Sequence, residues 1–437
     1  MSAVPSPDLL PETPNVVSTI QDAVRDDYSR LTDDNWPTSI EEYLAERYQL
    51  DIASEYAGCP LKNPWGKASG QLSMTARQVE EDVEAGLGFV VLKTVIAQDA
   101  AGDQSMEAWA IKEMRMLAEP IVGQRGDEGW TISWKGRGWW QTFDEYLDLI
   151  RNAQRIARGR GTLIVPSCKY HLPTPDETEW RRGEYEFTTR KILAAWQSES
   201  EDSAEPMPLE KDFSPTLAGS DLASQQAQIL DWLLTVPRLV RDAVAGHDKD
   251  KAVNSPVRLG LKLFNALFDD EFQLCMLDTI HEAEADRPDF FIYGNRLFDP
   301  KREFDGQRGI AYGGPDLSDR NLRIMSKFQA QTASTAAPLS WSATGSIVSG
   351  KMALEYALRG ASSFQLHTFF QLPSDVYRMT TGSKVRKALH ELYFHPRTGF
   401  IVWMHHLAGV LGLPTEMIRL RDIIGRGPQL PNVGTPD

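Results

Sequence analysis

The chain has few cysteines, and those it has are far apart. Its 437 residues include three, Cys59, Cys168 and Cys275, and no two of them form a C-x-x-C pair. A disulfide framework needs paired cysteines, and an all-cysteine zinc or iron–sulfur site needs clustered ones. The sequence therefore predicts neither, we expect no metal site, and the composition favours a reducing compartment.

The chain also lacks a long apolar run and an excess of basic residues. No stretch reaches the ~18 apolar residues that span a bilayer, and the opening residues, MSAVPSPDLLPETPNVV, have no basic region followed by an apolar run. Asp and Glu outnumber Lys and Arg by 61 to 46, for a net charge of -15, which argues against nucleic acid or an anionic membrane surface as the partner. We therefore expect a cytoplasmic protein that binds a small molecule.

What the sequence does contain is an alternation of short apolar runs and amphipathic segments. GFVVLKTV and TLIVPSC are typical of buried strands, and FDEYLDLIRNAQRIA between them is typical of a helix. The alternation continues to FQLHTFF and gives about eight strand candidates, the number of an α/β fold of the (β/α)8 TIM-barrel class. Hydrophobic residues make up 41% of the chain, which is enough for such a core.

The organisation predicted from this pattern has three parts. Residues 1–48 form an N-terminal extension, residues 49–385 form the barrel, and residues 386–437 form a helical tail packed on it. The segment near 196–206 is rich in Glu, Asp and Ser and has no apolar period. It is predicted to be an acidic surface insertion within the barrel.

Two loops near the end of the predicted barrel can bind a phosphate. Gly345 and Ser346 follow the seventh strand, and His367 and Thr368 end the eighth. In (β/α)8 barrels these two loops often form a phosphate site, because backbone N–H groups and hydroxyls converge there. An ordinary tight turn and a strand end account for the same residues, so both interpretations stay open.

Two lysines and an asparagine are expected at the same face of the barrel. Lys93 and Lys262 close the apolar strands VVLKT and LGLKL, and Asn295 follows DFFIY. An ammonium near the N1–C2=O edge of a reduced flavin stabilises the negative charge that develops there, and an amide can hydrogen-bond the ring. The alternatives are lysines that extend into solvent and an asparagine that only forms a turn.

Several segments also follow one another in a characteristic order. They are DIASEYAGCPLKNPWGKASGQLSMT, with an N-P-x-x-x-A-S-G motif, then AGLGFVVLKT, GQRGIAYGGPDLS and ATGSIVSGKMALEYALRGASSFQLHT. This set resembles the dihydroorotate dehydrogenase family, and most closely the flavin domain of dihydropyrimidine dehydrogenases, over roughly residues 50–375. The resemblance implies a barrel that binds flavin mononucleotide (FMN). The cofactor-binding residues that it implies are Ala68, Ser69, Lys93, Lys262, Asn295, Gly314, Gly345, Ser346 and Thr368.

The chain departs from this family where the substrate is bound. KDFSPTL stands in place of N-x-S-C-P-N or N-x-S-S-P-N, which puts Ser214 at the position of the general base. Lys211 then replaces a substrate-binding Asn, or Asp212 does if a one-residue gap is allowed. In SWKGRGWWQ, Lys135 or Arg137 lies near the position of another such Asn. Cations offer only donors and positive charge, so a carboxylate or phosphate substrate is predicted, unless these side chains face solvent and pair with the acidic insertion.

The group that moves the second proton is less well specified by the sequence. Ser214 is a poor base unless water or a neighbour carries the proton onward, and it could equally cap a loop. Lys93, beside the implied flavin, is the second catalytic candidate. His171 in SCKYHLPTP competes because histidine titrates near neutral pH, although a lone loop histidine is more often structural.

The sequence therefore predicts an FMN-dependent oxidoreductase that moves a hydride between flavin N5 and a carbon of a small, carboxylate-bearing substrate, forming or removing a C=C or C=N bond. Oxidation of dihydroorotate or another dihydropyrimidine is the second hypothesis. A non-catalytic flavin-binding homologue and a phosphate-binding barrel without flavin are the third and fourth. Because there is no cysteine cluster, electrons must be exchanged with a small oxidant or reductant or with a separate partner protein. A homodimer is also expected.

Overall fold

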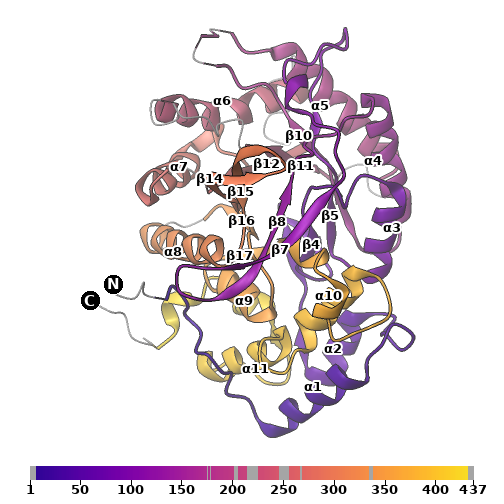
Figure 1. Ribbon diagram of the computed structural model, residues 1–437, viewed down its shortest axis with the longest axis vertical. Coiled ribbons are helices and arrows are strands. Elements are labelled where there is room, and N and C mark those ends of the chain that lie inside the picture. Colours follow the sequence, from indigo (N-terminus) through magenta and orange to yellow (C-terminus); the bar gives the residue numbers. More distant parts are fainter. Residues whose placement is uncertain are drawn as a thin grey trace.

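The protein is a barrel of parallel strands wrapped by helices (Figure 1). The computed structural model describes residues 6–431 apart from 175, 178, 201–204, 214–224, 246–254, 266–267 and 334–337. The strands of the central sheet are β4 (Trp65–Lys67), β5 (Phe89–Val91), β6 (Val95–Ile96), β9 (Leu163–Val165), β10 (Ser167–Lys169), β11 (Met207–Asp212), β12 (Val257–Phe264), β13 (Phe290–Asn295), β16 (Ser340–Thr344) and β17 (Ala361–Leu366).

This sheet closes on itself. Strand β17 pairs with β4, β4 pairs with β5, and β5 and β6 pair in turn with β9 and β10. Residues 92–94 separate β5 from β6, and Pro166, which has no N–H for the ladder, separates β9 from β10, so each pair is one interrupted strand. The 10 strands of the sheet are thus the strands of a (β/α)8 barrel, and the predicted fold class is confirmed.

Aromatic rings seal the N-terminal end of the barrel. β2 (Ser54–Tyr56) and β3 (Cys59–Leu61) form a hairpin that places Tyr56 against Phe89 and Phe290, with ring centroids 4.6 and 5.0 Å apart. A Cβ atom on Gly66 would lie 2.2 Å from the Phe89 ring, so this packing requires a glycine in β4. The seal leaves the C-terminal ends of the strands as the side from which a ligand enters.

Helices cover the outside of the barrel. They are α3 (Ala76–Ala85), α4 (Phe143–Ala157), α5 (Arg182–Gln197), α6 (Gln226–Ala245), α7 (Asp270–Glu282), α8 (Pro315–Thr332) and α9 (Gly350–Leu358). Helix α5 reaches into the segment predicted to be an acidic insertion, of which residues 201–204 lie outside the described part of the chain. Among the described residues, no helix has the length and apolar content needed to cross a membrane.

The two ends of the chain pack together against the barrel. Helices α1 (Ser18–Arg30) and α2 (Ile40–Tyr48) lie beside α10 (Lys384–Phe394) and α11 (Phe400–Leu411) at the bottom of Figure 1. The short strands β1 (Leu50–Asp51) and β18 (Ile418–Arg419) pair in parallel next to them. Asp27 of α1 is buried and accepts hydrogen bonds from Tyr43 and Tyr48, both at 2.6 Å, which ties α1 to α2.

Two hairpins cover the mouth of the barrel. They are β7 (Met116–Val122) with β8 (Glu128–Trp134), and β14 (Leu297–Phe304) with β15 (Gln307–Tyr312). In Figure 1 the first hairpin crosses in front of the barrel. Ion pairs join the two, with 3.4 Å between Arg302 and Glu119 and 2.8 Å between Lys135 and Asp305. The sequence analysis did not predict these two hairpins.

Candidate functional site

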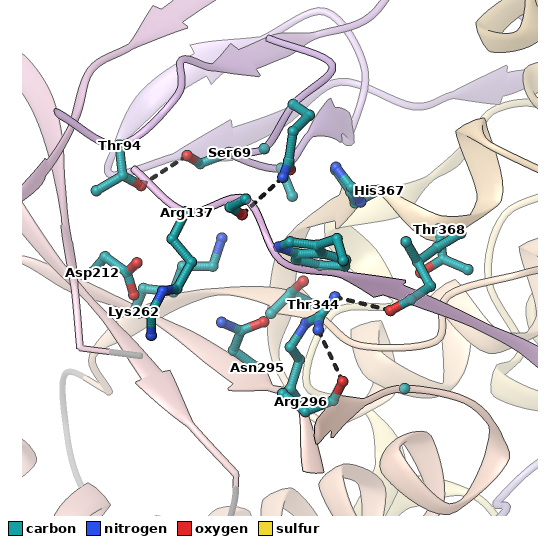
Figure 2. Close-up of a pocket in the computed structure, with 18 of the residues that line it drawn as sticks. Ser69, Thr94, Arg137, Asp212, Lys262, Asn295, Arg296, Thr344, His367 and Thr368 are labelled. Atoms are coloured by element: carbon teal, nitrogen blue, oxygen red, sulfur yellow. Dashed lines mark hydrogen bonds between the residues drawn. The ribbon is translucent and has the colours of Figure 1, made fainter. Parts of the chain in front are cut away.

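A cavity of about 720 Å³ lies at the C-terminal ends of the barrel strands, between them and the two hairpins. Both the strand ends and the hairpins contribute residues to its walls. The strand ends contribute Ala68, Ser69, Lys93, Thr94, Asp212, Lys262, Asn295, Thr344, Gly345, Ser346, Gln365, His367 and Thr368. The hairpins and the residues that adjoin them contribute Ile132, Trp134, Lys135, Gly136, Arg137, Arg296, Phe298 and the segment 307–311. Figure 2 shows labelled members of this set around one space.

The structure brings most of the predicted site residues into this one cavity. The residues that line it are Ala68, Ser69, Lys93, Lys135, Asp212, Lys262, Asn295, Gly345, Ser346 and Thr368. Gly314 does not line the cavity, but its N–H donates to Oγ of the lining residue Ser346 at 2.6 Å. Ser214 falls outside the described residues.

Strand β11 places the two alternative substrate-binding residues, Lys211 and Asp212, differently. Side chains of a strand alternate between its two faces, so Lys211 and Asp212 point in opposite directions. Asp212 lines the cavity. Lys211 does not, and its Nζ instead donates to the carbonyl oxygens of Tyr170 at 3.3 Å and Asp212 at 3.0 Å. Of the two, Asp212 is therefore the residue that a ligand in the cavity can contact, and its role in substrate binding stays a prediction.

The turn after β16 is shaped as an anion cradle. Gly345 has a φ of 105° and Ser346 a φ of 53°, and a Cβ atom on Gly345 would lie 2.6 Å from Asn321 Nδ2 and 2.8 Å from the Gly294 carbonyl oxygen. Only glycine fits there. Within the described residues, the N–H groups of Ser346 and Ile347 have no hydrogen-bond acceptor. The two uncovered amides therefore favour a negative charge at the cavity wall.

The two mouth lysines are buried, each with 5% of its surface exposed, but they have different surroundings. Lys262 Nζ donates to Gln365 Oε1 at 3.3 Å and lies 3.8 Å from Glu210 Oε2. Burial raises the pKa of Glu210, although Lys262 opposes this shift. Burial lowers the pKa of Lys93 to about 8, and the Asp212 carboxylate partly offsets this effect. Both lysines thus present nitrogen donors to the cavity.

Lys135 has a partner of its own. Its ammonium lies 2.8 Å from the Asp305 carboxylate at the tip of the β14–β15 hairpin, and 32% of its side chain is exposed. Arg137, two residues on, lines the same cavity but forms no ion pair among the described residues. Its buried Nε atom has no hydrogen-bond partner there, its guanidinium lies 5.8 Å from the centre of the Trp109 ring, and burial lowers its pKa. Arg137 is therefore the better-placed cation of this loop for a ligand.

Arg296 is a cavity residue that the sequence analysis missed. Its guanidinium stacks on Trp134 at 3.1 Å from the ring centre and donates to the carbonyl oxygens of Ala311 at 3.1 Å and Ile132 at 3.4 Å. Burial lowers the pKa of Arg296 to about 9. The available signal was its place directly after Asn295 at a strand end, but a lone arginine at such a position is usually solvated.

The two histidines near the site differ in position. His367 lines the cavity beside Trp134, with ring centroids 5.4 Å apart, and burial together with the nearby cations lowers its pKa well below the usual range. It is therefore neutral at physiological pH. His171, the competing acid–base candidate, does not line the cavity, and its Nε2 lies 3.2 Å from the Glu177 carboxylate. This position favours the structural interpretation of His171.

The cavity is strongly cationic although the chain is acidic. Among the described residues that line it, Asp212 is the one carboxylate. The lining cations are Lys93, Lys135, Arg137, Lys262, Arg296 and Arg308. A positive cavity in a chain with a net charge of -15 attracts and retains anions. The cradle amides, the two lysines and a cavity of this size fit the phosphate and the ring of FMN.

No protein-family model matches the sequence, and no curated protein matches it. Among solved structures, the chain is similar to a dihydroorotate dehydrogenase, "DHODH in complex with ferulenol from Eimeria tenella", with a TM-score of 0.56. The match covers 96% of this chain and 97% of that chain, at 15% sequence identity. At this identity the likeness shows a shared barrel fold, and function must be argued from the site. The closer resemblance to dihydropyrimidine dehydrogenases stays a prediction.

Proposed function

We propose that the protein is an FMN-dependent oxidoreductase that acts on a CH–CH or CH–NH bond of a small, anionic substrate. One observation carries the proposal: a single cavity contains both the uncovered amides at Ser346 and Ile347 and the buried ammonium groups of Lys93 and Lys262. FMN, when bound, supplies a two-electron hydride acceptor or donor at its N5 atom. The residues of this chain bind it, orient it and set the charge around it.

The cofactor residues divide by the part of FMN that each suits. Ser346 and Thr368, with the backbone of Gly345, would hold the phosphate. Lys262 would face the N1–C2=O edge of the ring, where an ammonium stabilises the reduced, negatively charged form. Asn295 can hydrogen-bond a ring edge because its amide is both donor and acceptor.

Arg137 is the proposed contact for the negative charge of the substrate. A guanidinium binds a carboxylate through two parallel N–H···O bonds, and the unpartnered Nε of Arg137 leaves that fork available. A buried cation without an anionic partner is also costly, and a bound carboxylate removes that cost. Lys135, which is paired with Asp305, would contribute less.

Lys93 and Ser214 are the proposed proton-transfer groups. Burial lowers the pKa of Lys93 to about 8, so its Nζ exchanges a proton close to neutral pH, as an acid–base group should. Ser214 keeps the role that the family resemblance implies. It follows β11, whose last residue, Asp212, lines the cavity.

A second candidate function, oxidation of a cyclic dihydropyrimidine, is favoured by one residue. Gln71 is fully buried, lines the cavity and donates through Nε2 to the Gly136 carbonyl oxygen at 2.8 Å. Its Oε1 has no donor among the described residues. An N–H group of a pyrimidine ring would suit that oxygen, whereas a carboxylate would not.

The visible spectrum of the purified protein tests the cofactor, and anaerobic stopped-flow bleaching tests the substrate. We expect yellow protein with one FMN per chain, and faster bleaching by carboxylic acids than by their amides or by dihydroorotate and dihydrouracil. Flavin that no candidate reductant bleaches would favour a non-catalytic homologue, and colourless protein that binds no flavin would favour a flavin-free barrel. Sedimentation analysis tests the proposed homodimer, and a separate electron-transfer partner remains part of the proposal.

A further inference from the structure

Arg296 is a cation without a carboxylate partner among the described residues. It forms no ion pair there, and its hydrogen bonds go to two main-chain carbonyl oxygens, of Ala311 and Ile132. Its guanidinium carbon lies over the Trp134 ring, 3.1 Å from the ring centre, and this contact together with the two hydrogen bonds restricts its movement. A desolvated guanidinium bound only by neutral groups favours an anion within reach.

The backbone at Arg296 is also strained. Its φ of 38° lies in the left-handed region, which glycine and asparagine adopt readily and arginine does not. In this conformation Arg296 lines the cavity. Strain of this kind persists where the surrounding structure imposes it, and it is concentrated at ligand sites.

The chain on either side of Arg296 and of its acceptor Ala311 leads to the cradle. The Gly294 carbonyl oxygen, two residues before it, packs so closely on Gly345 that a Cβ atom there would lie 2.8 Å away. Ala311, which accepts from Arg296, is followed by the turn whose Gly314 N–H binds Ser346 Oγ. In Figure 2, Arg296 lies below Thr344, with Thr368 to the upper right and Asp212 to the left.

We propose that Arg296 is a phosphate-binding residue, which pairs with the phosphate monoester of the cofactor beside the Gly345–Ser346 turn. This inference rests on the proposed flavin function and adds a residue that gives the cavity a preference for FMN over riboflavin. The two carbonyl acceptors and Trp134 orient the guanidinium, and its Nε, with no acceptor in the described part of the chain, completes a fork suited to a phosphate.

Binding of FMN and of riboflavin to the flavin-free protein tests the proposal, with flavin fluorescence as the readout. Arg296→Gln should lower the affinity for FMN about 10- to 100-fold and change the affinity for riboflavin by less than about 3-fold, because only the phosphate contact is lost. Arg296→Lys keeps the positive charge but loses the two parallel N–H donors of the guanidinium. Its affinity for FMN should lie between those of the wild type and Arg296→Gln. Lys301→Gln is the matched control, since it removes one charge from the exposed side of the neighbouring hairpin strand β14. It should leave the ratio of the two affinities unchanged.

The outcomes separate this inference from the proposed function. A selective loss of FMN affinity in Arg296→Gln supports the phosphate contact. Equal losses for FMN and riboflavin, or no loss for either, overturn it while the flavin function stands. A wild-type protein that binds neither flavin overturns both proposals. Riboflavin binding to the variant also reports that its cavity is folded.

Discussion

If the protein has the proposed function, replacement of Arg137 by glutamine should remove its preference for an acid over the corresponding amide. The structure sets the size of the effect. Arg137 has no carboxylate partner in the described residues, and its buried Nε has no acceptor. A carboxylate bound there gains a charge-assisted hydrogen bond of ~1.5–3 kcal/mol. Arg137→Gln should therefore weaken the binding of an acid substrate by about 10- to 150-fold. The binding of the amide substrate should change by less than about 3-fold, because the amide carries no charge.

Lys135→Gln provides the matched control two residues away. It removes the same charge from the same loop, but Lys135 is already paired with Asp305 at 2.8 Å in a partly exposed position. Such a pair contributes only ~0–1 kcal/mol, so acid and amide should respond alike. The assay is stopped-flow bleaching of the flavin with paired acid and amide substrates. If Lys135→Gln weakened the acid selectively and Arg137→Gln did not, the argument that an unpaired cation binds the substrate would be refuted. Faster bleaching by dihydroorotate or dihydrouracil than by every acyclic acid would favour the pyrimidine hypothesis.

Three further predictions concern the cofactor. Gly345→Asp should abolish FMN binding, measured by absorbance after reconstitution, because its Cβ would lie 2.6 Å from Asn321 Nδ2 and its charge would repel the phosphate; full occupancy would remove the turn from the site. Lys262→Met should lower the flavin reduction potential in a dye-coupled titration, because the reduced ring loses a nearby positive charge, and an unchanged potential would mean that Lys262 serves only the Glu210 network. Since the pKa of Lys93 is about 8, below its ordinary value, the lysine loses its charge as the pH rises through that point. A plot of the potential against pH should therefore bend near pH 8, and Lys93→Met should remove the bend.

The barrel and most of its mouth could be predicted because each depends on local sequence. Apolar runs such as VRLGLKLF define strands, and a residue near the C-terminal end of a strand, such as Lys262, lies toward the mouth once the strands are parallel. The choice between Lys211 and Asp212 could not be made, since a single-residue gap in an alignment reverses the face of every following side chain. The hairpin β7–β8 was missed because its pairing is not visible in the apolar pattern. Arg296 was missed with it, since the cavity in which Arg296 lies is completed by that hairpin.

The pairing of charges explains how an acidic chain maintains a cationic cavity. Two lysines of the cavity are each accompanied by a carboxylate: Lys262 has Glu210 beneath it at 3.8 Å, and Lys135 has Asp305 at 2.8 Å. Glu210 is itself held by Tyr56 of the hairpin that seals the barrel and by Gln365 of β17, so the position of Lys262 depends on the packed floor of the barrel. Such pairs fix a lysine in place but reduce the charge that it offers to a ligand. Arg137 and Arg296 have no such partner in the described chain, and each instead lies against a tryptophan ring. These two arginines, rather than the lysines that the sequence made conspicuous, should therefore determine which anions the cavity selects.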